Sequence, residues 1–155
     1  MLKRLRRKPR VGWREWVALP DLGVEAVKAK IDTGARTSAI HAFGVTEHED
    51  EDGALVRFAL HPVQRRRLPE VKCQARLRDK RAVRSSNGKS EMRYVIETTA
   101  RIGNEEFPIE LTLTNRDEMG FRMLLGREAL KRRFLVDPGR SYLAGKKPAS
   151  AGDNS

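Results

Sequence analysis

The stretch "VKAKIDTGARTSAIHA", from Val27 to Ala42, decides the fold. An apolar segment runs up to Ile31, a turn containing Asp32 and Gly34 follows, and a second strand-like segment comes after it. Aspartate and glycine are common at turns, so an Asp-Thr-Gly triplet alone is weak evidence for chemistry. A second stretch, "MLLGREAL" (residues 123–130), places an apolar pair and a glycine immediately before a helix-like segment. The two stretches together make the aspartate a candidate for catalysis.

Composition indicates a globular protein that attracts acidic partners. The 155 residues can form one domain with a real core, and 39% of them are hydrophobic. Charged residues make up 34% and the net charge is +11, so nucleic acid, anionic lipid and acidic peptide are all electrostatically favoured partners. Charge alone does not choose among these three.

Cysteine usage and hydropathy indicate a reducing compartment. Cys73 is the single cysteine, which excludes an intramolecular disulfide and a thiolate zinc cluster. No apolar segment typical of a signal peptide follows the basic N-terminus, and no run is long enough to span a membrane. We therefore expect a cytoplasmic protein without a membrane partner.

The chain is expected to contain one domain between two irregular ends. Residues 1–10 carry six cations and no acid, which is typical of a solvated basic arm. Residues 145–155 are small and polar, which is typical of a disordered tail. The domain is therefore expected over residues 11–144.

The patterns within this domain are mainly those of β-strands. Alternating or apolar segments bounded by turn signals predict strands over residues 12–20, 24–31, 37–45, 53–61, 72–83 and 107–113. Asn87-Gly88 predicts a two-residue hairpin turn, and Gly103-Asn104 a second turn. The acidic run over 47–53 is interpreted as a loop, 126–134 as the single helix, and 134–143 as a strand pair around a Pro-Gly turn. The expected fold class is an all-β, closed barrel with one short C-terminal helix.

Several short motifs are better explained by structure than by chemistry. Gly88-Lys89-Ser90 copies the end of a phosphate-binding loop, but the required earlier glycine is replaced by Val83. His48-Glu49 begins like a metalloprotease helix without a second histidine one turn later. The other histidines, His41 and His61, lie too far apart in sequence to indicate a zinc site. We expect no metal and no cofactor.

A basic stretch is a candidate surface for nucleic acid or another acidic ligand. Its members are Arg65, Arg66, Arg67, Arg76, Arg78, Lys80, Arg81 and Arg84. Aromatic residues that could stack on bases are scarce there, so nucleic-acid binding is the weaker interpretation, and solvated surface charge is the simplest one.

The ordered set of segments resembles the retropepsin-like aspartic peptidases, from Trp13 to Leu143. The matching pieces are "IDTGA", the hairpin tipped by "SSNGKS", the strand pair that follows it, and "LLGREAL". The segments "IELTLTNRDEM" and "FLVDPGRSYL" are more specifically similar to the small bacterial, RimB-like branch. That branch is often labelled ATP-dependent zinc protease and is associated with RimK-type glutamate ligases.

The resemblance implies a closed acid-protease barrel and an aspartic endopeptidase. Two aspartates about 3 Å apart share one proton and so serve as both acid and base. Because the chain has one Asp-Thr-Gly, a homodimer is required, with Asp32 of each subunit meeting on the two-fold axis. Thr33 would hydrogen-bond across the pair, and Gly34 would allow the tight turn.

The resemblance also assigns supporting and substrate-binding residues. Leu124, Leu125, Gly126 and Arg127 would support the catalytic turn from below. The substrate-binding candidates are Ala35 and Arg36 after the turn, together with Ser86, Asn87, Gly88 and Lys89 in a hairpin that would close over the substrate. Arg93 is a further candidate to flank the site.

One position departs from the pattern of the viral members. They carry an acidic residue after Asp-Thr-Gly-Ala, which holds the arginine of the later Gly-Arg pair, whereas this chain carries Arg36. Arg127 must therefore find another partner, and Arg36 either favours an acidic substrate or weakens the peptidase. Three functions stay open: an aspartic peptidase acting on acidic, glutamate-rich tails, a non-catalytic module that binds an acidic protein or RNA, and a zinc-dependent peptidase.

Overall fold

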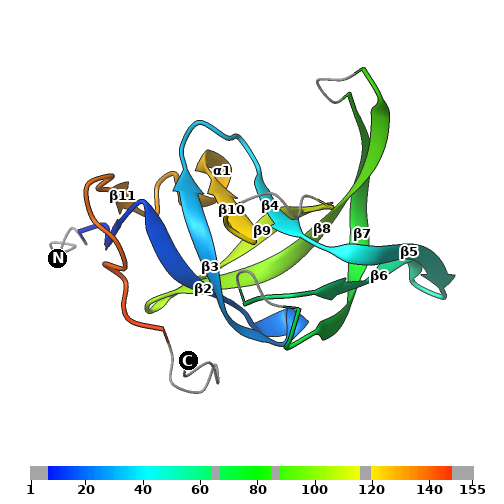
Figure 1. Cartoon of the computed structure of the whole chain (residues 1–155), viewed down its shortest axis with the longest axis horizontal. Coiled ribbons are helices and arrows are strands. Elements are labelled where there is room, and N and C mark those ends of the chain that lie inside the picture. Colours follow the sequence, from blue (N-terminus) through cyan, green and yellow to red (C-terminus); the bar gives the residue numbers. More distant parts are fainter. Residues whose placement is uncertain (1–6, 64–66, 85–87, 116–119, 148–155) are drawn as a thin grey trace, which may run out of the picture.

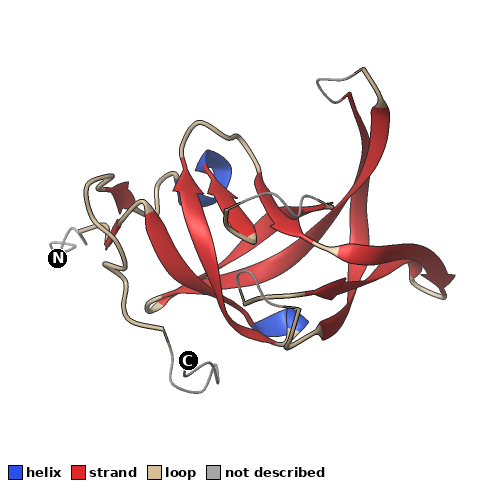
Figure 2. Cartoon of the chain, in the orientation of Figure 1, coloured by secondary structure: helices blue, strands red, loops and turns tan. Residues whose placement is uncertain are grey.

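Strands dominate the architecture of the protein (Figure 2). The computed structural model describes residues 7–63, 67–84, 88–115 and 120–147, without the side chains of Val83 and Arg84. A barrel forms the body of this part of the chain, and two long hairpin arms project beyond it (Figure 1).

Six strands close the barrel within the described residues. They are β2 (Arg14–Leu19), β3 (Val24–Asp32), β4 (Ser38–His41), β8 (Ser90–Ile102), β9 (Glu105–Thr114) and β10 (Met123–Gly126). Their spatial order is β2-β3-β10-β4-β9-β8, and a pair between Ala18 and Arg101 joins β8 back to β2. The predicted all-β barrel is therefore confirmed.

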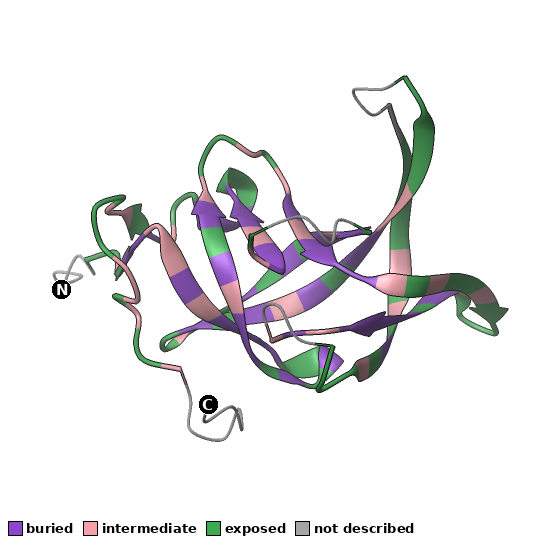
Figure 3. Cartoon of the chain, viewed as in Figure 1, coloured by how far each residue is buried: buried purple, intermediate pink, exposed green. Residues whose placement is uncertain are grey.

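Alternation along the strands builds the core. In β9, Phe107, Ile109, Leu111 and Leu113 are buried, whereas the residues between them are exposed or half-buried (Figure 3). Buried side chains of β3 and β10 face the same interior, among them Val27, Met123 and Leu125. Burial of such a large apolar face is the main stabilising contribution to the barrel.

The arms contain strand where the sequence suggested loop. β5 (Phe43–Asp50) pairs with β6 (Gly53–Leu60), and β6 pairs with β7 (Val71–Arg84). The interpretation of residues 47–53 as a solvated loop was wrong for residues 47–50, which are exposed but belong to β5, and holds for the turn at Glu51 and Asp52. Acidic residues of β5 find cationic partners on β7. Lys80 bonds Glu47 at 2.9 Å, and Arg76 bonds Asp50 at 2.7 Å. The predicted strand over 37–45 is split at Ala42, which separates β4 from β5.

One of the two predicted hairpin turns lies wholly within the described residues. Gly103-Asn104 joins β8 directly to β9, and Gly103 has the positive φ of 58° that this tight turn requires. Between β7 and β8 the last described pair is Arg84 with Ser90, and the predicted Asn87-Gly88 turn lies partly outside the described residues and stays a prediction.

The C-terminal region differs most from the expectation. The helix α1 covers only Arg127–Leu130, and the positive φ of Arg132 ends it early. The predicted strand pair over 134–143 was wrong: β11 (Leu135–Val136) pairs instead with β1 (Arg10–Val11). This pairing places Arg10, the last residue of the predicted basic arm, in a strand. No helix among the described residues is long and apolar enough to cross a membrane.

A buried carboxylate fixes the segment that follows β11. Glu15 is fully buried, and its oxygens accept hydrogen bonds from the backbone N–H groups of Gly12, Leu143 and Ala144 at 2.6, 2.8 and 3.1 Å. In a strand pair, the N–H groups of Leu143 and Ala144 would bond carbonyl oxygens of a neighbouring strand. Here they bond the carboxylate of Glu15, which explains why residues 137–147 form a strap along β2 instead of a strand. A short 3-10 helix, η1 (Pro20–Leu22), completes the described elements.

Candidate active site

Asp32 is the last residue of β3, at the start of a tight turn. Its Oδ1 accepts hydrogen bonds from the backbone N–H groups of Gly34 at 3.0 Å and Ala35 at 3.2 Å. Its Oδ2 accepts none from the residues that the structure describes. Thr33 and Gly34 are exposed and Asp32 is half-buried, so the turn presents an oriented carboxylate at the surface.

The strand β10 locks this turn from the side. Asp32 lies beside Gly126 in the parallel β3–β10 pair. A Cβ at Gly126 would come 2.5 Å from the carbonyl oxygen of Thr37, so only glycine allows the close approach. The hydroxyl of buried Ser38 accepts the N–H of Gly126 at 3.1 Å. These contacts fix the backbone of residues 32–38 against β10 and α1.

Arg127 and Glu128 attach the first turn of α1 to the same segment. Their backbone N–H groups bond the carbonyl oxygens of Ala35 at 2.8 Å and Arg36 at 3.1 Å. The guanidinium of Arg127 donates to the carbonyl oxygen of Gly34 at 3.2 Å. Arg127 therefore bonds the backbone of the turn. In the viral members the partner of this arginine is an acidic residue at the position that Arg36 occupies here.

Arg36 and the acidic residue Glu128 line the same side of the site. The pKa of Glu128 is lowered from its usual value, chiefly by a hydrogen bond from Lys131 and further by the charges of Arg36 and Arg127. Arg36 itself is exposed. Its charge is thus partly balanced by Glu128, on the side of the turn where α1 begins.

A cavity of about 750 Å³ opens beside Arg36. Its walls come from the 36–38 segment, from α1 and from the exposed face of β9, and Arg81 and Glu110 contribute charged groups. It is large enough for a peptide side chain or two. The sequence singled out Arg36 here but missed Glu128 and Glu110; the position of Glu128 directly after the Gly-Arg pair was the available signal.

The other predicted site residues are placed as follows. Leu125 is fully buried beneath the turn, whereas Leu124 is half-buried. Gly88 and Lys89 are exposed near the end of the β7–β8 hairpin, which projects beyond the barrel (Figure 1). Ser86 and Asn87 lie outside the described residues, and Arg93 is half-buried on β8.

Each histidine contacts a neighbouring side chain, and the three do not gather as a set of metal ligands. His41 is buried and stacks on Phe43, which also packs against His61 with a ring separation of 4.2 Å. His48 bonds the hydroxyl of Thr46. No group of three or more His, Cys, Asp or Glu converges among the described residues. Cys73 is buried, and this burial raises the pKa of its thiol to about 11.

The basic stretch of β7 is largely neutralised. Arg76 pairs with Asp50, Lys80 with Glu47, and Arg81 with Asp79. Arg78 lies 3.7 Å from Glu110. These pairs favour the interpretation of this stretch as surface charge over a phosphate-binding face.

Comparison with known proteins places the chain in a family. The profile described as "RimB-like: Retropepsin-like aspartic endopeptidase RimB" matches residues 10–147. A crystal structure of a protein of unknown function from Legionella pneumophila superposes with a TM-score of 0.71 at 26% identity, covering 88% of this chain and 98% of that one.

Curated relatives carry a different kind of name. Two proteins named "Probable alpha-L-glutamate ligase", from Shewanella pealeana and Parasynechococcus marenigrum, are 49% and 46% identical over 88% and 90% of this chain. The chain spans 30% of the length of each. The profile match and the barrel carrying Asp32 lead to one conclusion: the chain belongs to the RimB-like family of retropepsin-like aspartic endopeptidases.

Proposed function

We propose that the chain is an aspartic peptidase that works as a homodimer, with one Asp32 from each subunit, and cleaves acidic, glutamate-rich peptide or protein tails. One observation carries the proposal: Asp32 presents a carboxylate whose Oδ1 is fixed by two backbone N–H groups, on a turn whose tip is exposed. A fixed, surface-facing carboxylate is half of the pair that acid-type peptide hydrolysis needs.

The chemistry requires the second half from another chain. In the dimer, one Asp32 carboxylate takes a proton from water, whose oxygen bonds to the scissile carbonyl carbon, while the other Asp32, protonated, donates to the carbonyl oxygen. Collapse of the resulting diol breaks the C–N bond as the leaving nitrogen accepts the proton that the first carboxylate took from water, and the second carboxylate recovers its proton from a diol hydroxyl. The exposed side chain of Thr33 and the exposed Gly34 leave the tip of the turn accessible to an identical turn.

Two observations support an acidic substrate. Arg36 stands directly after the turn and borders the 750 Å³ cavity. The relatives named as glutamate ligases share this domain as about a third of their length. We propose a functional link in which the peptidase removes glutamate residues that a RimK-type ligase adds, both in the cytoplasm.

Replacing Asp32 tests the proposal. Purified protein is incubated with a peptide that ends in eight glutamates, and products are identified by mass spectrometry. Asp32→Asn should reduce cleavage below detection, because the amide can neither take nor donate the proton. Asp21→Asn, at an exposed aspartate of η1, is the matched control and should cleave at the wild-type rate.

The same assay separates the alternatives. Cleavage that survives Asp32→Asn contradicts the proposal, and additional loss of that cleavage to a chelator identifies a zinc-dependent peptidase. Binding of the peptide by wild-type protein without any cleavage identifies a non-catalytic module.

A further inference from the structure

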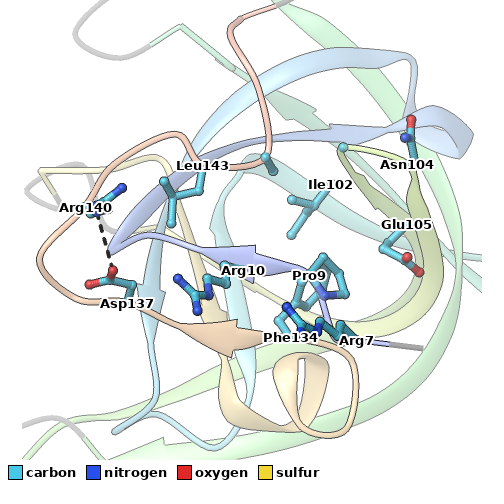
Figure 4. A pocket seen from close by; sticks show the side chains of 12 residues that line it. Arg7, Pro9, Arg10, Ile102, Asn104, Glu105, Phe134, Asp137, Arg140 and Leu143 are labelled. Carbon is cyan, nitrogen blue, oxygen red and sulfur yellow. Dashed lines mark ion pairs between the residues drawn. The ribbon is translucent and has the colours of Figure 1, made fainter. Parts of the chain in front are cut away.

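A second cavity shares no lining residue with the catalytic turn or with the cavity beside Arg36. It has a volume of about 500 Å³, and three separate segments build it: the start of the described chain, the β8–β9 turn, and the segment from Phe134 through the strap (Figure 4). Ile102, Phe134 and Leu143 supply apolar walls. Arg7, Arg10 and Arg140 supply cations. An apolar pocket with a few charged groups is typical of a ligand site.

The walls of this cavity are held by backbone hydrogen bonds. Leu135 donates to the carbonyl oxygen of Pro9 at 3.0 Å, and Asp137 donates to that of Val11 at 2.8 Å. Buried Glu15 fixes the N–H groups of Leu143 and Ala144 on the other side. The cavity is therefore formed before any ligand arrives, which lowers the entropic cost of binding.

Two of its cations lack counter-charges. Arg140 lies 3.7 Å from Asp137 (dashed in Figure 4), but Arg7 and Arg10 form no ion pair with any residue of the described ranges. The cations Arg76 and Lys80 on β7, by contrast, are paired. The lining carries three arginines, Arg7, Arg10 and Arg140, against two carboxylates, Glu105 and Asp137, so its net charge is positive and two of the arginines remain available to an acidic ligand.

A smaller cavity adjoins the first one. It has a volume of about 160 Å³, shares Gly103 and Ala144 with the larger cavity, and is lined by Arg101 and Lys146. Neither of these cations has an ion pair within the described residues. The strap crosses the β8–β9 turn between the cavities, where a Cβ on Gly103 would lie 3.1 Å from the carbonyl oxygen of Ala144.

We propose that these two cavities form one exosite for an extended acidic peptide segment, with carboxylates at Arg7 and Arg10 on one side of the strap and at Arg101 and Lys146 on the other. The apolar walls accommodate the methylene groups of glutamate side chains or a neighbouring apolar residue. A nucleic-acid strand fits less well, because no exposed aromatic ring on which a base could stack lines the larger cavity. The exosite rests on the acidic-substrate part of the proposed function and places a second anchor for that substrate outside the catalytic turn.

Binding measured without hydrolysis tests this exosite. A fluorescein-labelled peptide of eight glutamates is titrated with full-length Asp32→Asn protein, so that the outcome does not depend on peptidase activity. Adding Arg7→Gln and Arg10→Gln should weaken binding at least about tenfold, because two charge-assisted contacts are lost. In NMR spectra of isotope-labelled protein, the backbone amide signals of Gly103 and Asn104 should shift when the unlabelled peptide is added.

A matched control separates this site from the effect of net charge. Arg76→Gln with Lys80→Gln removes the same formal charge from paired positions and should change binding less than twofold. Equal weakening by both pairs of substitutions, or unmoved signals at Gly103, would overturn the exosite. Tighter binding of a single-stranded oligonucleotide than of the peptide at the same ionic strength would also overturn it, in favour of nucleic acid. If the wild-type protein binds the peptide at this exosite but does not cleave it, the proposed peptidase activity is contradicted and the exosite is not.

Discussion

Asp32 and Gly126 lie side by side in parallel strands, and the Cβ that Gly126 lacks would stand 2.5 Å from the carbonyl oxygen of Thr37. The two stretches of sequence that carry the family resemblance therefore meet at one backbone contact. The position of the carboxylate depends on this contact, because Gly126 is the residue paired with Asp32 where β3 ends.

Gly126→Ala should strongly destabilise the domain. The added methyl group must displace the backbone of residues 36–37, and we expect a loss of about 2–4 kcal/mol in the free energy of unfolding, measured with urea. Gly120→Ala is the control, because a Cβ there meets nothing within 4 Å, and its cost should stay below about 0.5 kcal/mol. Equal costs at the two positions would contradict the packing described for the turn.

Ser38→Ala should weaken the same junction by removing an acceptor. The buried N–H of Gly126 would lose its partner, at a cost of about 1–3 kcal/mol in the free energy of unfolding. Ser90→Ala, at an exposed position on β8, provides the comparison and should be nearly neutral. A neutral Ser38→Ala would show that the hydroxyl does not hold β10 in place.

Glu15→Gln should release the C-terminal strap. The carboxylate accepts three backbone N–H groups, and an amide can offer only one oxygen to them. Limited proteolysis should cut within residues 137–147 at least about tenfold faster than in the wild type, since local opening exposes the strap. Glu49→Gln, at an exposed position of β5, should leave the cleavage rate unchanged. An intact strap in Glu15→Gln would assign its order to the stacking of Trp16 on Tyr142 instead.

The arm formed by β5, β6 and β7 should depend on pH through Asp50. A hydrogen bond from Arg76 lowers the pKa of Asp50 to about 2. Because the pKa is lower in the folded state, this pair stabilises the arm above the unfolded pKa of about 4, and the contribution is lost as the pH falls through 2. Carboxyl signals followed by NMR should show the pKa of Asp50 rising towards its ordinary value in Arg76→Gln. A titration of Asp50 that is the same in both proteins would exclude this pairing.

Cys73 should be nearly inert to thiol reagents. Burial raises the pKa of its thiol to about 11, so about 0.1% is thiolate at pH 8. Labelling by a maleimide should be at least about a hundredfold slower than for the unfolded chain in urea. Rapid labelling of the native protein would show that the strand β7 opens near Cys73.

The sequence predicted the barrel well because alternation in segments such as β9 reports burial directly. It also located Asp32 and Gly126, because the order of their motifs constrains how the strands must meet. It failed where distant partners decide the local structure. The acidic residues of β5 look like loop residues until Arg76 and Lys80 lie opposite them, and the strap looks like a strand until the carboxylate of Glu15 takes its N–H groups. The cavity walls around Arg7 and Arg101 come from segments far apart in the chain, so no local pattern could reveal them.

A mixing experiment tests the shared carboxylate pair most directly. Wild-type protein at constant concentration is equilibrated with increasing Asp32→Asn protein, and cleavage of the glutamate-tailed peptide is followed. If each active site needs one Asp32 from both chains, heterodimers are inactive, and the rate should fall towards zero as the variant reaches large excess. A rate that stays at the wild-type value in excess variant, with mixed dimers shown to form, would contradict a site shared between two chains.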